Sequence, residues 1–163
     1  MRIGIIGPSK LRNKELISKV ADILKNYEIV LTPDKKSVSE FFAKEYLKFG
    51  GKKVYEVLPL DDKEFGYSWV NVNLGEKINC GTWRNQPEKL NEECDVLICL
   101  GYSVGGLIEI CYSKWFGKKP VYILKEFIEG KLPKELEESL DLRYIGIRKL
   151  EKELSERLKN VTK

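Results

Sequence analysis

The sequence contains no histidine. This absence excludes Ser-His-Asp and Cys-His catalytic arrangements and any zinc site held by His. Carboxylates, Arg, Lys and Tyr remain as candidates for acid, base or nucleophile. Cysteine is also scarce, with four in 163 residues, and none of them forms a CxxC pair. We therefore expect small buried cysteine side chains, without a disulfide or a metal site.

Long apolar runs and a strong charge of one sign are missing as well. No apolar stretch approaches the length that spans a membrane, and the N-terminus enters a strand pattern without the layout of a signal peptide. We therefore expect a cytoplasmic protein with no membrane partner. The 29 Lys and Arg residues alternate with 25 Asp and Glu residues, which gives a formal net charge of +4. Because this charge is mild and dispersed, we expect no nucleic acid partner.

The most informative stretch is Gly-Tyr-Ser-Val-Gly-Gly-Leu-Ile-Glu at residues 101–109, after an apolar run at residues 96–100. The apolar run predicts a strand buried on both faces, and the glycines predict a turn that opens a helix. The free N–H groups at such a helix start favour an anion, typically a phosphate. Glu109 would lie one turn inside the helix, where its carboxylate faces a ligand. Glycine turns of this kind also serve only to pack a helix on a sheet, so the pattern alone leaves both interpretations open.

Apolar periodicity divides the rest of the chain into alternating strands and helices. Strands are predicted at residues 2–7, 29–31, 53–58, 120–124 and 144–147, with a short strand or extended loop around Trp69, Val70 and Val72. Helices are predicted at residues 16–24, 38–49, 87–91, 107–115, 133–140 and 150–158. This alternation predicts an α/β fold, a parallel sheet covered on both sides, because parallel neighbours need crossover connections. No linker or repeat interrupts the pattern, so residues 1–163 are expected to form a single domain.

Turns at residues 7–10, 32–37 and 101–106 follow predicted strands. All of them fall at carboxyl ends of strands and should share one rim of the molecule. Ligands of α/β sheets collect at this rim, near the point where the strand order reverses. Ser9 and Lys10 offer a hydroxyl and a cation to a phosphate, although a serine cap beside a solvated lysine is the simpler interpretation.

The run from residue 79 to residue 109, closed by Gly-Lys-Lys-Pro-Val at residues 117–121, resembles the Rossmann-like nucleotide-binding superfamily of lysine-decarboxylase-like proteins. That superfamily includes the Lonely Guy (LOG) cytokinin riboside 5′-monophosphate phosphoribohydrolases and molybdenum cofactor carrier proteins. The similarity covers most of the chain, and the Arg84-Asn85 pair is typical of one branch. It implies a Rossmann-like three-layer αβα sandwich with a mainly parallel sheet. It also implies a nucleotide or other phosphorylated ligand, no required cofactor or metal, and a homodimer or higher homo-oligomer.

The resemblance implies a reaction too. In the LOG enzymes the motif PGGxGTxxE surrounds the nucleotide, and its Glu acts with an upstream Arg at the N-glycosidic bond. On this chain Glu109 matches that Glu, Arg84 matches the Arg, and Gly106 replaces the Thr. A carboxylate there would stabilise an oxocarbenium-like state, and an Arg would grip phosphate or carboxylate. The implied activity is hydrolysis of a nucleoside 5′-monophosphate, with Glu109 and Arg84 as catalytic residues.

The chain departs from the family pattern in two loops. Tyr102 and Ser103 stand where the motif has paired glycines, and residues 32–37 replace the family's other glycine-rich loop. Asp34 in that segment would repel a phosphate, while its Lys and Ser neighbours are candidates to bind one. The expected ligand-binding residues are Gly7, Pro8, Ser9, Lys35, Lys36, Ser37, Asn85, Gly101, Tyr102, Ser103, Val104, Gly105 and Gly106.

Other interpretations of the same residues stay open. The protein could be a non-catalytic carrier or sensor of a nucleotide-like cofactor such as molybdenum cofactor, or an enzyme resembling nucleoside deoxyribosyltransferases. Glu109 could pair with a neighbouring side chain, and Arg84 could be a structural ion-pair partner of Glu109 or Asp95. The tryptophans, Trp69 and Trp83 among them, could stack on a base. Lysine decarboxylation is not expected, because no Lys lies in a recognisable Schiff-base setting.

Overall fold

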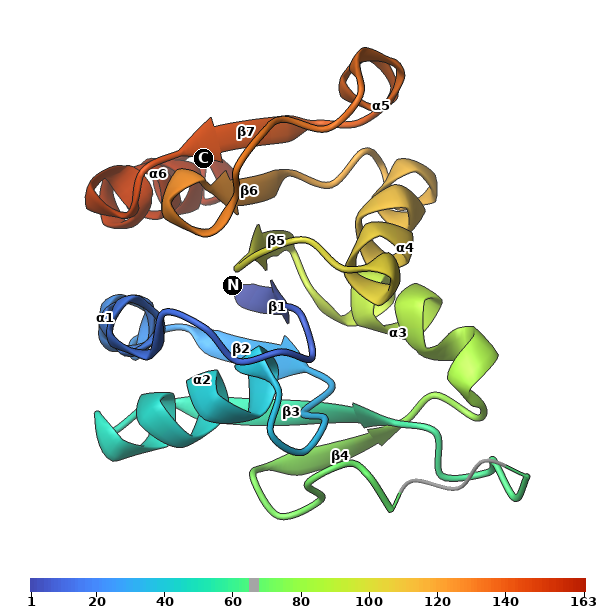
Figure 1. Cartoon of the computed structure of the whole chain (residues 1–163). Helices are drawn as coiled ribbons and strands as arrows, with labels where there is room; N and C mark the ends of the chain where they lie inside the picture. The colour runs from blue at the N-terminus through green and yellow to red at the C-terminus, as the bar shows by residue number, and fades with distance from the viewer. Residues whose placement is uncertain (65–67) are drawn as a thin grey trace.

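The computed structural model describes residues 1–64 and 68–163, which build a seven-stranded sheet in the order β4-β3-β2-β1-β5-β6-β7 (Figure 1). Every neighbouring pair of strands is parallel. The strands are β1 (Arg2–Ile6), β2 (Glu28–Leu31), β3 (Lys53–Leu58), β4 (Glu76–Asn79), β5 (Val96–Cys99), β6 (Val121–Leu124) and β7 (Leu142–Ile145). The predicted α/β class with a parallel sheet is therefore confirmed.

Helices cover both faces of the sheet, so the fold has three layers (Figure 1). One apolar core packs α1 (Lys14–Leu24), α2 (Val38–Lys48) and α6 (Ile147–Val161) against one face. A second core packs α3 (Gln86–Glu93), α4 (Val104–Tyr112) and α5 (Lys134–Ser139) against the other. The short 3-10 helices are η1 (Trp83–Asn85), η2 (Ser113–Trp115) and η3 (Lys125–Phe127). None of the described helices has both the length and the apolar character needed to cross a bilayer.

The strand order reverses between β1 and β5, the two central strands. From β1 the chain proceeds outward through β2 and β3 to β4, and then returns to place β5 on the other side of β1. Gly4 of β1 pairs with Leu97 of β5 in this central register. The loops after β1 and β5 therefore leave the sheet toward opposite faces, which opens a crevice at their carboxyl ends.

The edge of the sheet beyond β3 differs from the sequence-based expectation. Around Trp69 and Val70 the structure has a loop with one antiparallel bridge, between Asp34 and Val70, and the edge strand follows as β4. The residues of β4 are Glu-Lys-Ile-Asn and mostly exposed, so they carry no apolar alternation that would have revealed a strand. The irregular segment expected here includes residues 65–67, which lie outside the described residues.

The last strand was predicted two residues too late. β7 spans Leu142–Ile145, and α6 already begins at Ile147. Glu126 fixes this boundary, because its Oε1 accepts a hydrogen bond from the Ile147 backbone N–H at 2.9 Å. The contact comes from a residue 21 positions earlier and cannot be read from local periodicity.

Glu56 is a fully buried charged residue in β3. Its Oε1 accepts hydrogen bonds from the backbone N–H groups of Leu74 and Gly75. Burial raises the pKa of the Glu56 carboxyl, while these two hydrogen bonds act in the opposite direction. The residue therefore anchors the segment that leads into β4 to the neighbouring strand.

Replacing Glu56 by Leu should lower the free energy of unfolding by about 1 to 3 kcal/mol, because two backbone N–H groups would lose their buried acceptor. Glu56→Gln keeps an acceptor oxygen at the same place and should cost less. Urea unfolding followed by circular dichroism measures both variants. If Glu56→Leu were as stable as the parent protein, the anchoring role would be wrong.

Candidate functional site

A cavity of about 490 Å³ lies at the carboxyl ends of the central strands. A volume of this size is typical of small-molecule sites. It is lined by Ile5, Gly7, Ser9, Thr32, Asp34, Ser37, Ser39, Trp83, Gln86, Ser103, Val104, Gly105, Gly106 and Glu109. We call it the rim cavity. The turns after β1, β2 and β5 all contribute to it, at the location where the topology opens the sheet.

Two helices begin at the rim cavity, each with a serine cap. Ser37 accepts a hydrogen bond from the Glu40 N–H at the start of α2, and Ser103 accepts one from the Gly106 N–H at the start of α4. The start of α2 is further satisfied, because Glu40 Oε1 accepts the Lys36 N–H at 3.0 Å. Both helix dipoles direct a partial positive charge toward the cavity, and at α2 the carboxylate of Glu40 opposes it.

Gly106 allows α4 to pack tightly against β1. A Cβ atom at this position would lie 2.8 Å from Cγ2 of Ile6 and 3.0 Å from the Ser103 hydroxyl. A Cβ atom at the adjacent Gly105 would meet no atom within 4 Å. Gly106 is therefore needed for packing, whereas the absence of a side chain at Gly105 leaves open space beside the cavity.

We expect Gly106→Ala to lower the free energy of unfolding by about 1 to 3 kcal/mol, since the added methyl group overpacks the helix start and disturbs its cap. Gly105→Ala is the matched control and should leave stability unchanged or slightly higher. Thermal unfolding compares the two variants directly. Equal melting temperatures would contradict the packing role of Gly106.

Glu109, in the second turn of α4, lines the cavity and is half-buried. Burial raises the pKa of this carboxyl from 4.5 to about 8, and the charge of Asp34 adds to the effect. A side-chain hydrogen bond with Gln86 opposes it by favouring the ionised form. Gln86 is itself buried and held by Thr32, whose hydroxyl accepts from its Nε2 at 2.9 Å. In the ligand-free protein Glu109 is thus mainly protonated at neutral pH.

Asp34 is the second carboxyl group of the rim cavity. Burial raises its pKa, but from a starting value of 3.8. Its Oδ1 is enclosed without a hydrogen-bond partner, and its side chain forms no ion pair or hydrogen bond within residues 1–64 and 68–163. The cavity therefore holds two carboxyl groups, and that of Asp34 has unused acceptor capacity.

Trp83 supplies an aromatic wall to the cavity, and Trp69 lies behind it. Their rings are stacked, with centroids 5.3 Å apart and planes at 18°. The segment that carries Trp69 is held to the turn after β2, because the Trp69 carbonyl accepts the Lys35 N–H at 2.7 Å. The aromatic wall is therefore fixed by backbone pairing as well as by ring contact.

The structure brings eight of the predicted site residues to this cavity: Gly7, Ser9, Ser37, Ser103, Val104, Gly105, Gly106 and Glu109. Pro8, Gly101 and Tyr102 line a neighbouring cavity of about 800 Å³ instead. The remaining predicted residues, Lys35, Lys36, Arg84 and Asn85, are exposed and line neither cavity.

Arg84 lies in η1 beside Trp83, with its side chain exposed. Across the described part of the chain it forms no ion pair with Glu109 or Asp95, the two partners considered from sequence. Asp95 instead accepts the Arg2 backbone N–H at 2.7 Å. The catalytic role assigned to Arg84 by resemblance stays a prediction.

Three polar residues of the cavity were not assigned to a site from the sequence: Thr32, Ser39 and Gln86. Asp34 was expected only to repel a phosphate. Thr32 and Asp34 follow β2 directly, so their place after a central strand was a usable signal. Gln86 carried no such signal, because its role depends on contacts with Thr32 and Glu109 from distant parts of the chain. Among the described residues, no group of three or more Cys, Asp or Glu side chains is arranged to share a metal ion.

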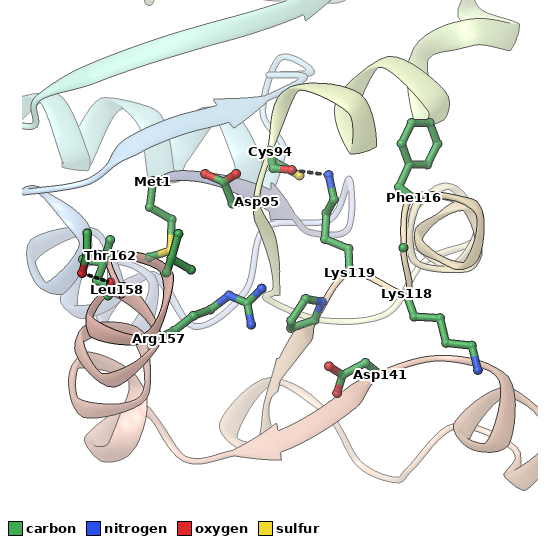
Figure 2. Close-up of a pocket in the computed structure, with 13 residues that line it drawn as sticks. Met1, Cys94, Asp95, Phe116, Lys118, Lys119, Asp141, Arg157, Leu158 and Thr162 are labelled. Carbon is green, nitrogen blue, oxygen red and sulfur yellow. Dashed lines mark hydrogen bonds between the residues drawn. The ribbon is translucent and has the colours of Figure 1, made fainter.

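A further cavity, of about 610 Å³, lies at the opposite end of the sheet (Figure 2). Arg157 extends into it from α6, while Lys119 turns toward the end of α3 (Figure 2). The Lys119 Nζ donates to the backbone carbonyls of Asn91 and Cys94, where a cation favourably meets the negative end of the helix dipole. None of the predicted site residues lines this cavity.

Comparison with solved structures identifies the same fold in other proteins. The molybdenum cofactor carrier protein of Chlamydomonas reinhardtii superimposes with a TM-score of 0.73 at 18% identity, over 97% of this chain and 98% of that one. A molybdenum cofactor binding protein of the phototrophic bacterium Rippkaea orientalis gives a TM-score of 0.69 at 16% identity, over 99% and 97% of the two chains. The structural-genomics target TM1055 gives 0.72 at 17% identity, over 95% and 98%.

No protein-family model and no curated protein sequence matches the chain. The structural likeness therefore rests on the whole path of the backbone, at identities that establish fold alone. It confirms the Rossmann-like three-layer sandwich that the sequence resemblance implied. The chain has the fold of the molybdenum cofactor carrier proteins.

Proposed function

We propose that the chain binds a nucleoside, or its 5′-monophosphate, in the rim cavity and hydrolyses the N-glycosidic bond. The observation that carries this proposal is that the carboxyl groups of Glu109 and Asp34 line one cavity, where burial raises the pKa of Glu109 to about 8. Pairs of this kind supply an acid and a carboxylate at one pH, which is what cleavage of a glycosidic bond requires. The location at the carboxyl rim of a Rossmann-like sheet supports the same assignment.

In this mechanism Glu109 donates its proton to the departing base as the carbon–nitrogen bond breaks, and the bonding electron pair stays with the base. The carboxylate of Asp34 stabilises the positive charge that develops on the sugar. Water then adds to the anomeric carbon, and its proton returns to Glu109. The products are the free base and the sugar or sugar phosphate.

The alternative of a molybdenum cofactor carrier is supported by the shared fold. That cofactor is an anion, with a phosphate group and a dithiolene-bound metal. The described residues that line the rim cavity include two carboxyls but no Lys, Arg or Cys. This donor set offers no cation for the phosphate and no thiolate for the metal, whereas a nucleoside needs neither, so hydrolysis of a nucleoside is the better-supported function.

The proposal is tested by incubating the protein with purine nucleosides and their 5′-monophosphates and quantifying released base by chromatography. We expect kcat/KM to fall about tenfold per pH unit above about pH 8, because the acid must be protonated in the free enzyme. A transferase would release base only when a second base is supplied as acceptor. A rate that rises with pH through this range would show that Glu109 acts as a base, and absence of base release would overturn hydrolysis.

A further inference from the structure

The rim cavity contains negative charge without a cation to balance it. Asp34 and Glu109 are its acidic residues; Asp34 supplies the charge, whereas Glu109 is mainly protonated at neutral pH, and none of the described lining residues is Lys or Arg. The cations near this rim do not line the cavity. Lys35 Nζ donates to the Ser68 carbonyl at 2.6 Å, and Lys10 and Arg12 line the neighbouring cavity. Lys36 and Arg84 are exposed and line neither cavity. A phosphate in the rim cavity would lie beside the Asp34 carboxylate with only helix dipoles to compensate.

The aromatic wall of the cavity suits a planar, uncharged group. Trp83 is backed by the stacked ring of Trp69, which is itself held by the backbone pairing of residues 33–35 with residues 69–71. A supported indole offers a rigid surface on which a heterocyclic base can stack without loss of side-chain freedom. The wall and the protonated Glu109 are therefore both suited to the base of a nucleoside.

Asp34 offers a hydrogen-bond acceptor for the hydroxyl groups of a sugar. Its side chain lines the cavity, is half-buried and accepts no hydrogen bond from the described residues; because Oδ1 is fully enclosed, a ligand would reach the carboxylate through its other oxygen. An enclosed carboxylate that lacks donors is unfavourable unless a ligand supplies them. The hydroxyl groups of a ribose are neutral donors of the required kind, whereas a phosphate dianion offers none.

Resting on the proposed function, we propose that the cavity selects an uncharged nucleoside over the corresponding 5′-monophosphate. The base stacks on Trp83, a sugar hydroxyl donates to Asp34, and the absence of a cation among the described lining residues disfavours the phosphate. Asp34 and Trp83 are thus the residues that determine specificity. This narrows the ligand class that the sequence resemblance implied.

The test compares the affinities of inosine, inosine 5′-monophosphate and hypoxanthine by isothermal titration, with adenosine and guanosine and their monophosphates in parallel. The chain of residues 1–163 is used with the substitution Glu109→Gln, so that no probe is consumed. We expect each nucleoside to bind at least about tenfold more tightly than its monophosphate, since a buried like charge costs more than about 1.4 kcal/mol. A monophosphate that binds as tightly as its nucleoside, or no binding of any probe, would overturn the inference.

Two variants separate the contributions of Asp34 and Trp83 to ligand affinity. In the same background, Asp34→Asn should weaken inosine about tenfold, strengthen the monophosphate and leave hypoxanthine unchanged, because only the sugar contact and the repulsion are removed. Trp83→Ala should weaken nucleoside and base alike by about 10- to 100-fold. Trp115→Ala, at a tryptophan outside the cavity that is 70% exposed, is the control and should change nothing. Unchanged nucleoside affinity in both site variants would refute the assignment of these residues.

The failure of this inference and the failure of the proposed function are distinguishable. Base release by the unsubstituted protein decides hydrolysis, whereas the ratio of nucleoside to monophosphate affinity decides selection. Release of base from monophosphates with higher kcat/KM than from nucleosides would preserve the activity and reject the selection. Tight nucleoside binding without release of base would reject the hydrolytic activity and preserve the selection of nucleosides.

Discussion

Replacing Glu109 by Gln is expected to lower kcat for base release by about 10²- to 10⁴-fold, the usual contribution of a positioned acid. The amide has nearly the shape of the carboxyl group, and its oxygen can still accept a hydrogen bond from Gln86. Ligand affinity should therefore change little while proton donation is lost. Steady-state kinetics of base release, with isothermal titration of the same preparation, measures both quantities.

The matched control for this loss is Glu88→Gln, which makes the same chemical change at an exposed position of α3. It should retain full turnover. If Glu109→Gln also retained turnover, Glu109 would not be the acid, and the cavity would be better explained as a binding site for a ligand that is not cleaved. A parallel loss of affinity and kcat would point to a damaged cavity.

Much of the fold could be predicted because its central strands are apolar on both faces. Three of the five residues of β1 are Ile, and all four residues of β5 are Val, Leu, Ile or Cys. A glycine-containing turn follows each strand, so their burial was evident from the sequence. β4 could not be found in the same way, because it is a short polar edge strand positioned by pairing with β3. Its location depends on the Glu56 contacts, which join residues 18 and 19 positions apart.

Site residues that belong to one local sequence motif could be predicted. Site residues that come together from distant parts of the sequence could not. Glu109 and the glycines of α4 belong to one local motif, and the structure places them together in the rim cavity. Asp34 was read from sequence only as a repulsive charge, since nothing local indicates that it lies near Glu109. The stacking of Trp83 on Trp69 depends on a segment that returns from the far edge of the sheet.

Replacing Glu109 by Gln should also stabilise the protein, by about 2 to 4 kcal/mol at pH 7. The pKa of Glu109 rises from 4.5 to about 8 on folding. The folded state therefore binds more protons than the unfolded state between these values, and stability falls as pH rises through this window, by about 1.4 kcal/mol per pH unit. The Gln side chain does not titrate, so the free energy of unfolding of the variant does not fall in this way as the pH rises.

The pH dependence distinguishes this effect from an ordinary improvement in packing. Urea unfolding of both proteins should give similar free energies near pH 4, where Glu109 is protonated in either state, and a gap that widens up to about pH 8 and then stays constant. Carboxyls other than Asp34, whose charge acts on Glu109, titrate alike in both proteins and cancel in the difference. A gap independent of pH would mean that Glu109 is not desolvated in the folded protein. A widening gap would mean that the fold sacrifices stability to keep a protonated acid at the cavity, which is the trade-off expected of a functional site.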